Sequence, residues 1–218
     1  MADIKRISRT LGVSLNDVVM ALVAHALRQY LIGKDQLPAR ALVAAMPVSL
    51  RESGNADANN QVSMAQVALA TQIGNDLERL RRIAAATGQI RERVAALRHL
   101  IPTDFPGFAA PIWASGLSRL WARGRVAEKL PPLANLVVSN VPGPPVSLYL
   151  AGARLLHNYP VSIVTHGLAL NITVQSYAGQ MEFGLLACRA AVPDAAVLGR
   201  ALQRAHQAYL DLIDRPGE

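Results

Sequence analysis

Apolar side chains recur at helical spacing through the first part of the chain. Between Ser14 and Gly33 they lie three or four positions apart, as on one face of a helix. Ser14 has the side chain of an N-cap, and Asp17 occupies the capping-box position three residues later. The pattern predicts a helix that begins after Ser14 and ends at Gly33.

The next elements are predicted from shorter patterns. The apolar run Ala41–Val48 is typical of a buried strand, the polar stretch Glu52–Asn60 of a loop, and Gln61–Thr71 of a second strand. A long basic helix is expected from Asn75 to about Leu100. After three prolines, residues Ile112–Leu130 again show helical spacing.

Beyond Pro132 the pattern becomes that of β-structure and then of one last helix. Tyr177-Ala-Gly-Gln180 predicts a hairpin turn, and Pro193-Asp194 opens the final helix. The sequence thus predicts one lobe with two parts. Residues 1 to about 132 form a helix-rich part, and residues from about 133 to 218 form a β-rich part with a terminal helix. This order predicts an α/β fold with a mixed, mostly antiparallel sheet packed against helices. The expected strands are Asn135–Asn140, Ser147–Ala151, Arg154–Tyr159, Ala169–Tyr177 and Gln180–Ala187.

A long segment of this β-rich part is almost free of charge. Between Pro131 and Met181, Arg154 is the only side chain that is ionised at neutral pH. Prolines and asparagines interrupt every apolar run of about 20 residues, which excludes a membrane-spanning helix there. We expect buried strands and loops that line an apolar cavity.

Composition indicates a folded globular protein and argues against a disulfide framework and a metal site. Hydrophobic residues make up 51% of the 218 residues and charged residues 17%, as in a folded globular chain. The single cysteine, Cys188, excludes an internal disulfide framework and suits a reducing compartment. The histidines show no paired ligand spacing, so no metal site is expected. Residues 1–12 do not resemble a signal peptide.

The net charge of +7 predicts an anionic partner but does not choose among nucleic acid, phosphate-bearing cosubstrates and lipid surfaces. The arginines from Arg79 to Arg98 alternate with glutamates and read as a solvated helix face, so we expect no nucleic acid partner. A second basic cluster includes two tryptophans, which is typical of a helix at an anionic membrane surface, although core packing of the tryptophans remains an alternative. Its residues are Trp113, Arg119, Trp121, Arg123, Arg125 and Lys129.

Several ordered motifs resemble those of one enzyme family. They are Val13–Arg28, Leu42–Arg51, Asn135–Pro144, Leu148–Arg154, Tyr159–Ser162, Leu170–Val174 and Met181–Leu185. Together they resemble the C-terminal half of bacterial wax ester synthase/diacylglycerol acyltransferases. The resemblance implies a lobe with a fold like that of chloramphenicol acetyltransferase. In that family two such lobes enclose a tunnel, where a long-chain acyl group passes from acyl-CoA, the cosubstrate, to a fatty alcohol or diacylglycerol.

The catalytic base of the family lies in an HHxxxDG motif of the N-terminal lobe. No two histidines are adjacent in this sequence. The resemblance therefore implies a second lobe that needs an N-terminal acyltransferase lobe as its partner, with no catalytic base and no bound cofactor of its own. It further implies a cytoplasmic protein at a membrane or lipid droplet surface, and an isolated lobe is expected to self-associate. The alternative is a non-catalytic lobe that binds lipid or acyl-CoA.

The resemblance also names candidate site residues. Asn16 and Asp17 match an Asn-Asp motif near the active site of the family, although Asp17 can equally be only a helix cap. Asn171 and Thr173 share one face of their strand and match an Asn-Ile-Thr element; there a donor can stabilise an oxyanion, or bond only within the sheet. Candidates for the tunnel or for the contact between lobes are Ser139, Asn140, Pro142, Gly143, Pro144, Tyr159 and Pro160. A conformationally demanding crossover without ligand contact would explain the proline-rich loop equally well.

Overall fold

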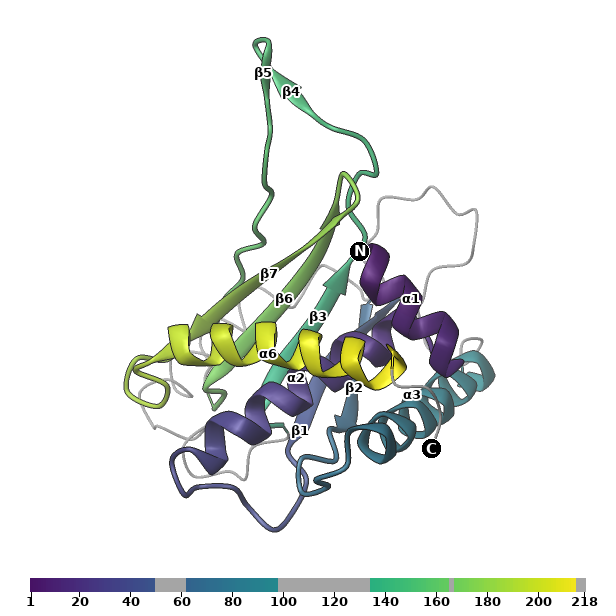
Figure 1. Ribbon diagram of the computed structural model, residues 1–218, viewed down its shortest axis with the longest axis vertical. Coiled ribbons are helices and arrows are strands. Elements are labelled where there is room, and N and C mark those ends of the chain that lie inside the picture. The colour runs from purple at the N-terminus through teal and green to yellow at the C-terminus, as the bar shows by residue number, and fades with distance from the viewer. Residues whose placement is uncertain (50–61, 98–133, 165–166, 215–218) are drawn as a thin grey trace, which may run out of the picture.

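The computed structural model describes residues 1–49, 62–97, 134–164 and 167–214, and its centre is a five-stranded mixed sheet (Figure 1). The strand order is β2-β1-β3-β6-β7. The inner pairs β1/β3 and β3/β6 are parallel, and the outer pairs β1/β2 and β6/β7 are antiparallel. The predicted mixed sheet is confirmed, and its strands are β1 (Val43–Ser49), β2 (Val62–Ala68), β3 (Leu136–Val141), β6 (Leu170–Tyr177) and β7 (Gln180–Ala187).

The described helices lie on one side of this sheet (Figure 1). They are α1 (Ala2–Leu11), α2 (Leu15–Ile32), α3 (Asp76–Leu97) and α6 (Ala195–Asp214). Helix α2 contacts α1, α3 and α6, and eleven of its eighteen residues are buried. This central position explains why its sequence is apolar around most of its circumference. The predicted helices after Ser14, Asn75 and Pro193 are therefore confirmed within the described residues.

Helix α1 was not expected from the sequence. Charged residues cover most of its surface, and the buried apolar side chains are only those of Ile4 and Ile7. It ends at Gly12, whose φ of 66° is left-handed and favours glycine. None of the described helices is by itself long and apolar enough to cross a membrane; α1 and α2 meet that test of length and composition only together, as a pair bent by 101°.

Both described β-hairpins turn on an Ala-Gly pair. Ala178 and Gly179 join β6 to β7 with φ angles of 44° and 82°, and Ala151 and Gly152 repeat this with 49° and 84°. Two consecutive positive φ angles match the right-handed twist of the flanking strands. The hairpin predicted at Tyr177–Gln180 is confirmed.

The second hairpin lies outside the central sheet, and its strands are shorter than the two that were predicted there. It consists of β4 (Tyr149–Leu150) and β5 (Ala153–Arg154), which pair only with each other. The strands expected at Ser147–Ala151 and Arg154–Tyr159 are therefore wrong in extent, because most of their residues have no strand beside them. We call residues 145–156, which project from the end of the sheet (Figure 1), the arm.

The charge-free segment is only partly buried, whereas the sequence predicted buried strands and loops around an apolar cavity. Strand β6 and the first part of β3 are buried, as expected, whereas Asn140 and Val141 at the end of β3 are exposed. From β3 to Ile163, however, ten large apolar side chains are exposed rather than buried around a cavity. They are Val141, Val146, Leu148, Tyr149, Leu150, Leu155, Leu156, Tyr159, Val161 and Ile163.

One hydroxyl group ties the two legs of the arm to the sheet. Tyr177 Oη accepts a hydrogen bond from the nitrogen of Leu148 and donates one to the oxygen of Leu155, both over 2.9 Å. Leu155 N also donates to Leu148 O. The base of the arm is thus fixed to β6. The expected loop at residues 52–60, the helix at 112–130 and the whole Trp-Arg-Lys cluster lie outside the described residues.

Candidate functional site

The face of the sheet turned away from the described helices carries the polar candidates. Leu136, Leu170 and Ile172 face the helices and belong to the core. Because side chains alternate along a strand, the neighbours of these residues face the opposite way. Strand pairing aligns Ser139 with Thr173 and Thr173 with Gly184 on that second face. This face therefore carries the hydroxyl groups of Ser139 and Thr173 on neighbouring strands, with Gly184 beside them on β7.

Asn171 is the centre of a hydrogen-bonded network on this face. Its Nδ2 donates to Ser162 Oγ and to Ile163 O, each over 3.0 Å, and its Oδ1 accepts from Thr173 Oγ1 over 2.9 Å. Asn171 and Thr173 are both buried. An amide nitrogen has two donor hydrogens, and here both are in use. In this arrangement Asn171 holds the chain above the sheet and has no free donor for an oxyanion.

The segment that Asn171 holds is fixed at two further points. We call residues 157–163 the strap. In the strap, His157 Nδ1 lies 3.0 Å from Oε1 of the buried Glu182. The His157 ring stacks on the ring of Tyr159, with the ring centroids 5.4 Å apart. A Cβ atom at Gly184 would overlap the oxygen of Pro160. Strand β7 therefore needs glycine where the strap crosses it. The sequence singled out Tyr159 and Pro160 but gave His157 no role.

The proline-rich loop after β3 is held by its glycine. Gly143 N donates to Ser176 Oγ over 3.0 Å, and Ala178 N donates to Pro144 O over 3.0 Å. A Cβ atom at Gly143 would overlap the oxygen of Ser176. The glycine is thus required by its close approach to β6, whereas the sequence offered it as a tunnel or lobe-contact residue, or as part of a demanding crossover. Among the other loop candidates, Ser139 and Pro144 are half-buried, whereas Asn140 and Pro142 are exposed.

Asn16 and Asp17 lie at the start of α2, on the other side of the sheet. Asn16 Nδ2 lies 3.1 Å from Sδ of Met46, a core residue of β1. Asp17 is buried, completes the capping box by accepting from Ser14 N, and accepts a 2.5 Å hydrogen bond from Thr87 Oγ1. These contacts join α2 to α3. The structure does not bring Asn16 and Asn171 together.

A polar cluster of His25 on α2, Asp76 and Arg79 on α3, and Tyr209 on α6 joins these three helices, and it corrects the interpretation of the basic helix. Arg81, Arg82, Arg91 and Arg93 are exposed as predicted, but Arg79 is fully buried. It forms an ion pair with Asp76 and donates to Ile73 O over 2.7 Å. An arginine at an inward position of an amphipathic helix is the signal that would have identified it.

Burial and charge shift the pKa values in this cluster. Burial, and then the charges of Arg79, Arg204 and Arg28, lower the pKa of His25 to about 4. The Asp76 carboxylate lies 2.8 Å from His25 Nδ1 and opposes this shift, but Arg79 neutralises it. Burial raises the pKa of Tyr209 to about 12. His25 is therefore neutral at physiological pH, and its ring is enclosed rather than available for catalysis.

Comparison with known proteins identifies the family. Residues 58–209 match the model of the WS/DGAT C-terminal domain, which covers more than half of the chain. The chain belongs to this family. Within the WS/DGAT family it is 37% identical over 216 residues to a Mycobacterium bovis protein provisionally named a diacylglycerol O-acyltransferase, and 37% identical over 190 residues to O-acyltransferase WSD of Acinetobacter baylyi.

A solved WS/DGAT structure supports the same assignment. The wax ester synthase/diacylglycerol acyltransferase of Marinobacter aquaeolei VT8 superposes with a TM-score of 0.70 and 33% identity. The match covers 97% of this chain and 46% of that chain. This chain covers 46% of the Mycobacterium bovis protein and 40% of O-acyltransferase WSD. The chain thus spans less than half the length of these relatives.

More distant structures support the fold alone. The first condensation domain of the calcium-dependent antibiotic synthetase superposes with a TM-score of 0.53 at 14% identity. The chain covers 44% of that domain. The fold like that of chloramphenicol acetyltransferase, which the resemblance to wax ester synthase/diacylglycerol acyltransferases implied, is confirmed.

Proposed function

We propose that this chain is the second lobe of a two-lobe O-acyltransferase that transfers a long-chain acyl group from acyl-CoA to a fatty alcohol or diacylglycerol. The catalytic base would come from an N-terminal lobe with an HHxxxDG motif, because this sequence has no adjacent histidines. The observation that carries the proposal is the exposed apolar surface of the arm and strap. Membership of the WS/DGAT family supplies the reaction class.

The exposed surface needs a cover that the described residues do not supply. Leu150 is 83% exposed, Val161 83% and Ile163 69%, and all belong to one continuous stretch of chain. Exposed apolar side chains gathered on one segment are typical of interaction sites in soluble proteins. The base of the arm is fixed by Tyr177, so its apolar tip is presented in a defined direction. We assign this surface to the contact with the N-terminal lobe.

The proposed reaction defines what each lobe contributes. The histidine of the partner lobe takes the proton of the acceptor hydroxyl, whose oxygen attacks the thioester carbonyl carbon. The tetrahedral intermediate then collapses, the C–S bond breaks, and coenzyme A leaves as the thiol with that proton. This lobe supplies one wall of the acyl tunnel. Its network of Asn171, Ser162 and Thr173 keeps the strap in place at that wall.

The test is release of free coenzyme A from palmitoyl-CoA with hexadecanol or with diacylglycerol. The chain is assayed alone and after co-expression with the N-terminal lobe of the Marinobacter aquaeolei enzyme. Activity only in the associated pair supports the proposal. Activity of the chain alone would mean that another group is the base. No activity in an associated pair would overturn the proposal.

The second candidate is a lobe that binds lipid or acyl-CoA without catalysis. The observation that favours it is the same apolar arm, in a chain with a net charge of +7 that suits an anionic bilayer. It predicts binding to vesicles that contain phosphatidylglycerol, without thiol release. Peripheral association with a membrane or lipid droplet, and self-association of the isolated lobe through the arm, belong to both proposals.

A further inference from the structure

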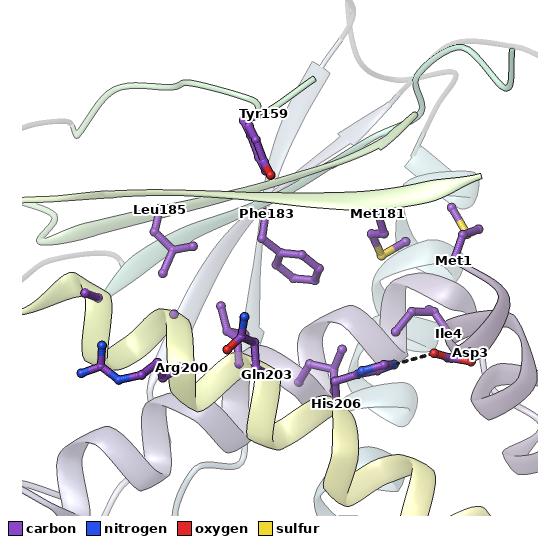
Figure 2. A pocket seen from close by; sticks show the side chains of 14 residues that line it. Met1, Asp3, Ile4, Tyr159, Met181, Phe183, Leu185, Arg200, Gln203 and His206 are labelled. Carbon is purple, nitrogen blue, oxygen red and sulfur yellow. Dashed lines mark ion pairs between the residues drawn. The ribbon is translucent and has the colours of Figure 1, made fainter. Parts of the chain in front are cut away.

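A groove of about 530 Å³ runs between β7 and the helices α1 and α6 (Figure 2). It lies on the helix-covered side of the sheet, opposite the face that carries Ser139, Asn171 and Thr173. Met181, Phe183 and Leu185 project from β7 toward α6, as Figure 2 shows. Most of the lining is apolar, chiefly from Ile4, Leu22, Met181, Phe183 and Leu185, and Gln203 of α6 also lines the groove.

The two ends of the groove differ in charge. Arg200 lies at the Leu185 end (Figure 2), is exposed, and forms no ion pair with any carboxylate of the described residues. At the Met1 end His206 Nε2 lies 3.3 Å from Asp3 Oδ2. A guanidinium group binds a carboxylate through two parallel hydrogen bonds. The groove therefore has a cationic entrance at one end and a mostly apolar lining.

These features fit one kind of ligand. The lining residues of α6 from Ala196 to His206 extend over about 15 Å at the helical rise. The volume lies in the range of small-molecule sites, and the methionine and phenylalanine side chains adapt to flexible chains. We propose that the groove binds a fatty acid anion, with its carboxylate on Arg200 and its alkyl chain along Phe183 and Met181. This inference concerns binding only and does not depend on the proposed acyl transfer.

Gly199 offers a direct way to block the groove. It lines the groove on α6, and a Cβ atom at this position would meet no atom within 4 Å. A leucine side chain there would enter the space of the alkyl chain without straining the helix. Gly88 of α3 is the matched control, because it is also helical, has equal free space and does not line the groove.

The experiment uses the full chain labelled with ¹³C in its methionine methyl groups. Of its five methionines, Met1 and Met181 line the groove, whereas Met64 lies on β2 at the opposite edge of the sheet. Dodecanoate is added below the concentration at which it forms micelles. The Met1 and Met181 methyl resonances should shift with saturation while that of Met64 stays constant. Gly199→Leu should weaken binding by at least about tenfold, and Gly88→Leu should not.

The head group is tested separately. Arg200→Glu should weaken dodecanoate binding by about tenfold or more but change dodecanol binding by less than about twofold. Arg204→Glu, an exposed arginine on the same helix outside the groove, is the control. The methyl resonances of the core residues Met20 and Met46 report whether each variant is folded.

Three results would overturn the inference. The first is no saturable shift of Met1 or Met181, and the second is an equal shift of Met64, which would show unspecific adsorption. The third is equal binding of dodecanoate by the wild-type chain and the Arg200→Glu variant, which would contradict the assigned head group. None of these results bears on coenzyme A release by the paired lobes, so the two proposals fail separately.

Discussion

The nitrogen of Gly143 lies 3.0 Å from the hydroxyl oxygen of Ser176, and the space between the two backbones excludes even a methyl group. Gly143→Ala should therefore lower the free energy of unfolding by about 1–3 kcal/mol, because the loop or β6 must move. Urea denaturation measures this change. The control Gly88→Ala adds a methyl group to a helix in open space and should stabilise the chain by about 0.5–1 kcal/mol. Equal effects at both glycines would contradict the close-approach argument.

The amide of Asn171 anchors the strap, and its removal should loosen that segment. Asn171→Ala leaves Ser162 Oγ, Ile163 O and Thr173 Oγ1 without this partner, at a cost of about 1–3 kcal/mol. Hydrogen exchange of residues 161–164 should accelerate, while that of α2 should not. In a double-mutant cycle, Ser162→Ala should add little to Asn171→Ala, since the two side chains share one bond. Full additivity would show that they act independently.

The main elements of the fold could be predicted because their patterns are strong and local. The capping box at Ser14 and Asp17, the apolar face of α6 and the Ala-Gly turn at Ala178 all specify their conformation within a few residues. Helix α1 could not be predicted, because only Ile4 and Ile7 distinguish it from a charged coil. The strands expected around the arm were wrong, because apolar sequence indicates burial without saying which surface provides it.

The candidate site could be predicted only as a list of residues. Asn171 and Thr173 were correctly placed on one face of β6, since strand alternation requires it. Their partners Ser162 and Ile163 depend on where the strap crosses the sheet, which no local pattern encodes. Asn16 was grouped with them, yet it packs on Met46 at the helix-covered side.

Asp17 should contribute to stability rather than to catalysis. It accepts hydrogen bonds from Ser14 N and from Thr87 Oγ1, and an asparagine there has only one acceptor oxygen. Asp17→Asn should therefore lower the free energy of unfolding by about 1–3 kcal/mol. The exposed Asp35→Asn is the control and should change it by less than about 0.5 kcal/mol. A chain of unchanged stability with loss of coenzyme A release in the pair would instead assign Asp17 to the chemistry.

His25 should make the stability of the lobe depend on pH. Its pKa is lowered to about 4 in the folded chain from 6.5 in the unfolded chain, so below pH 6.5 the unfolded state binds the extra proton. The contribution of neutral His25 to the free energy of unfolding is complete above pH 6.5. As the pH falls toward 4, the free energy of unfolding decreases by roughly 1–3 kcal/mol. Urea denaturation at a series of pH values should show a flatter profile for His25→Gln. Parallel profiles for the two chains would refute this assignment.

The apolar arm should determine association with the N-terminal lobe while contributing little to the fold of this one. Leu150 is 83% exposed at the tip, so Leu150→Asp should change the free energy of unfolding of the isolated chain by less than about 0.5 kcal/mol. In the co-expressed pair it buries an unpaired carboxylate, and the affinity between the lobes should fall by about thirtyfold or more. Analytical ultracentrifugation measures both this association and any self-association of the isolated lobe.

The matched control for the arm is Met64→Asp. Met64 is 56% exposed on β2, at the edge of the sheet opposite β7. If the arm is the contact between lobes, Met64→Asp should leave association and coenzyme A release unchanged, whereas Leu150→Asp should reduce both. If the two variants weaken association equally, the contact extends over the sheet edge as well. If Leu150→Asp has no effect on an associated pair, the arm is not the interface, and its apolar side chains would have to be assigned to a lipid surface.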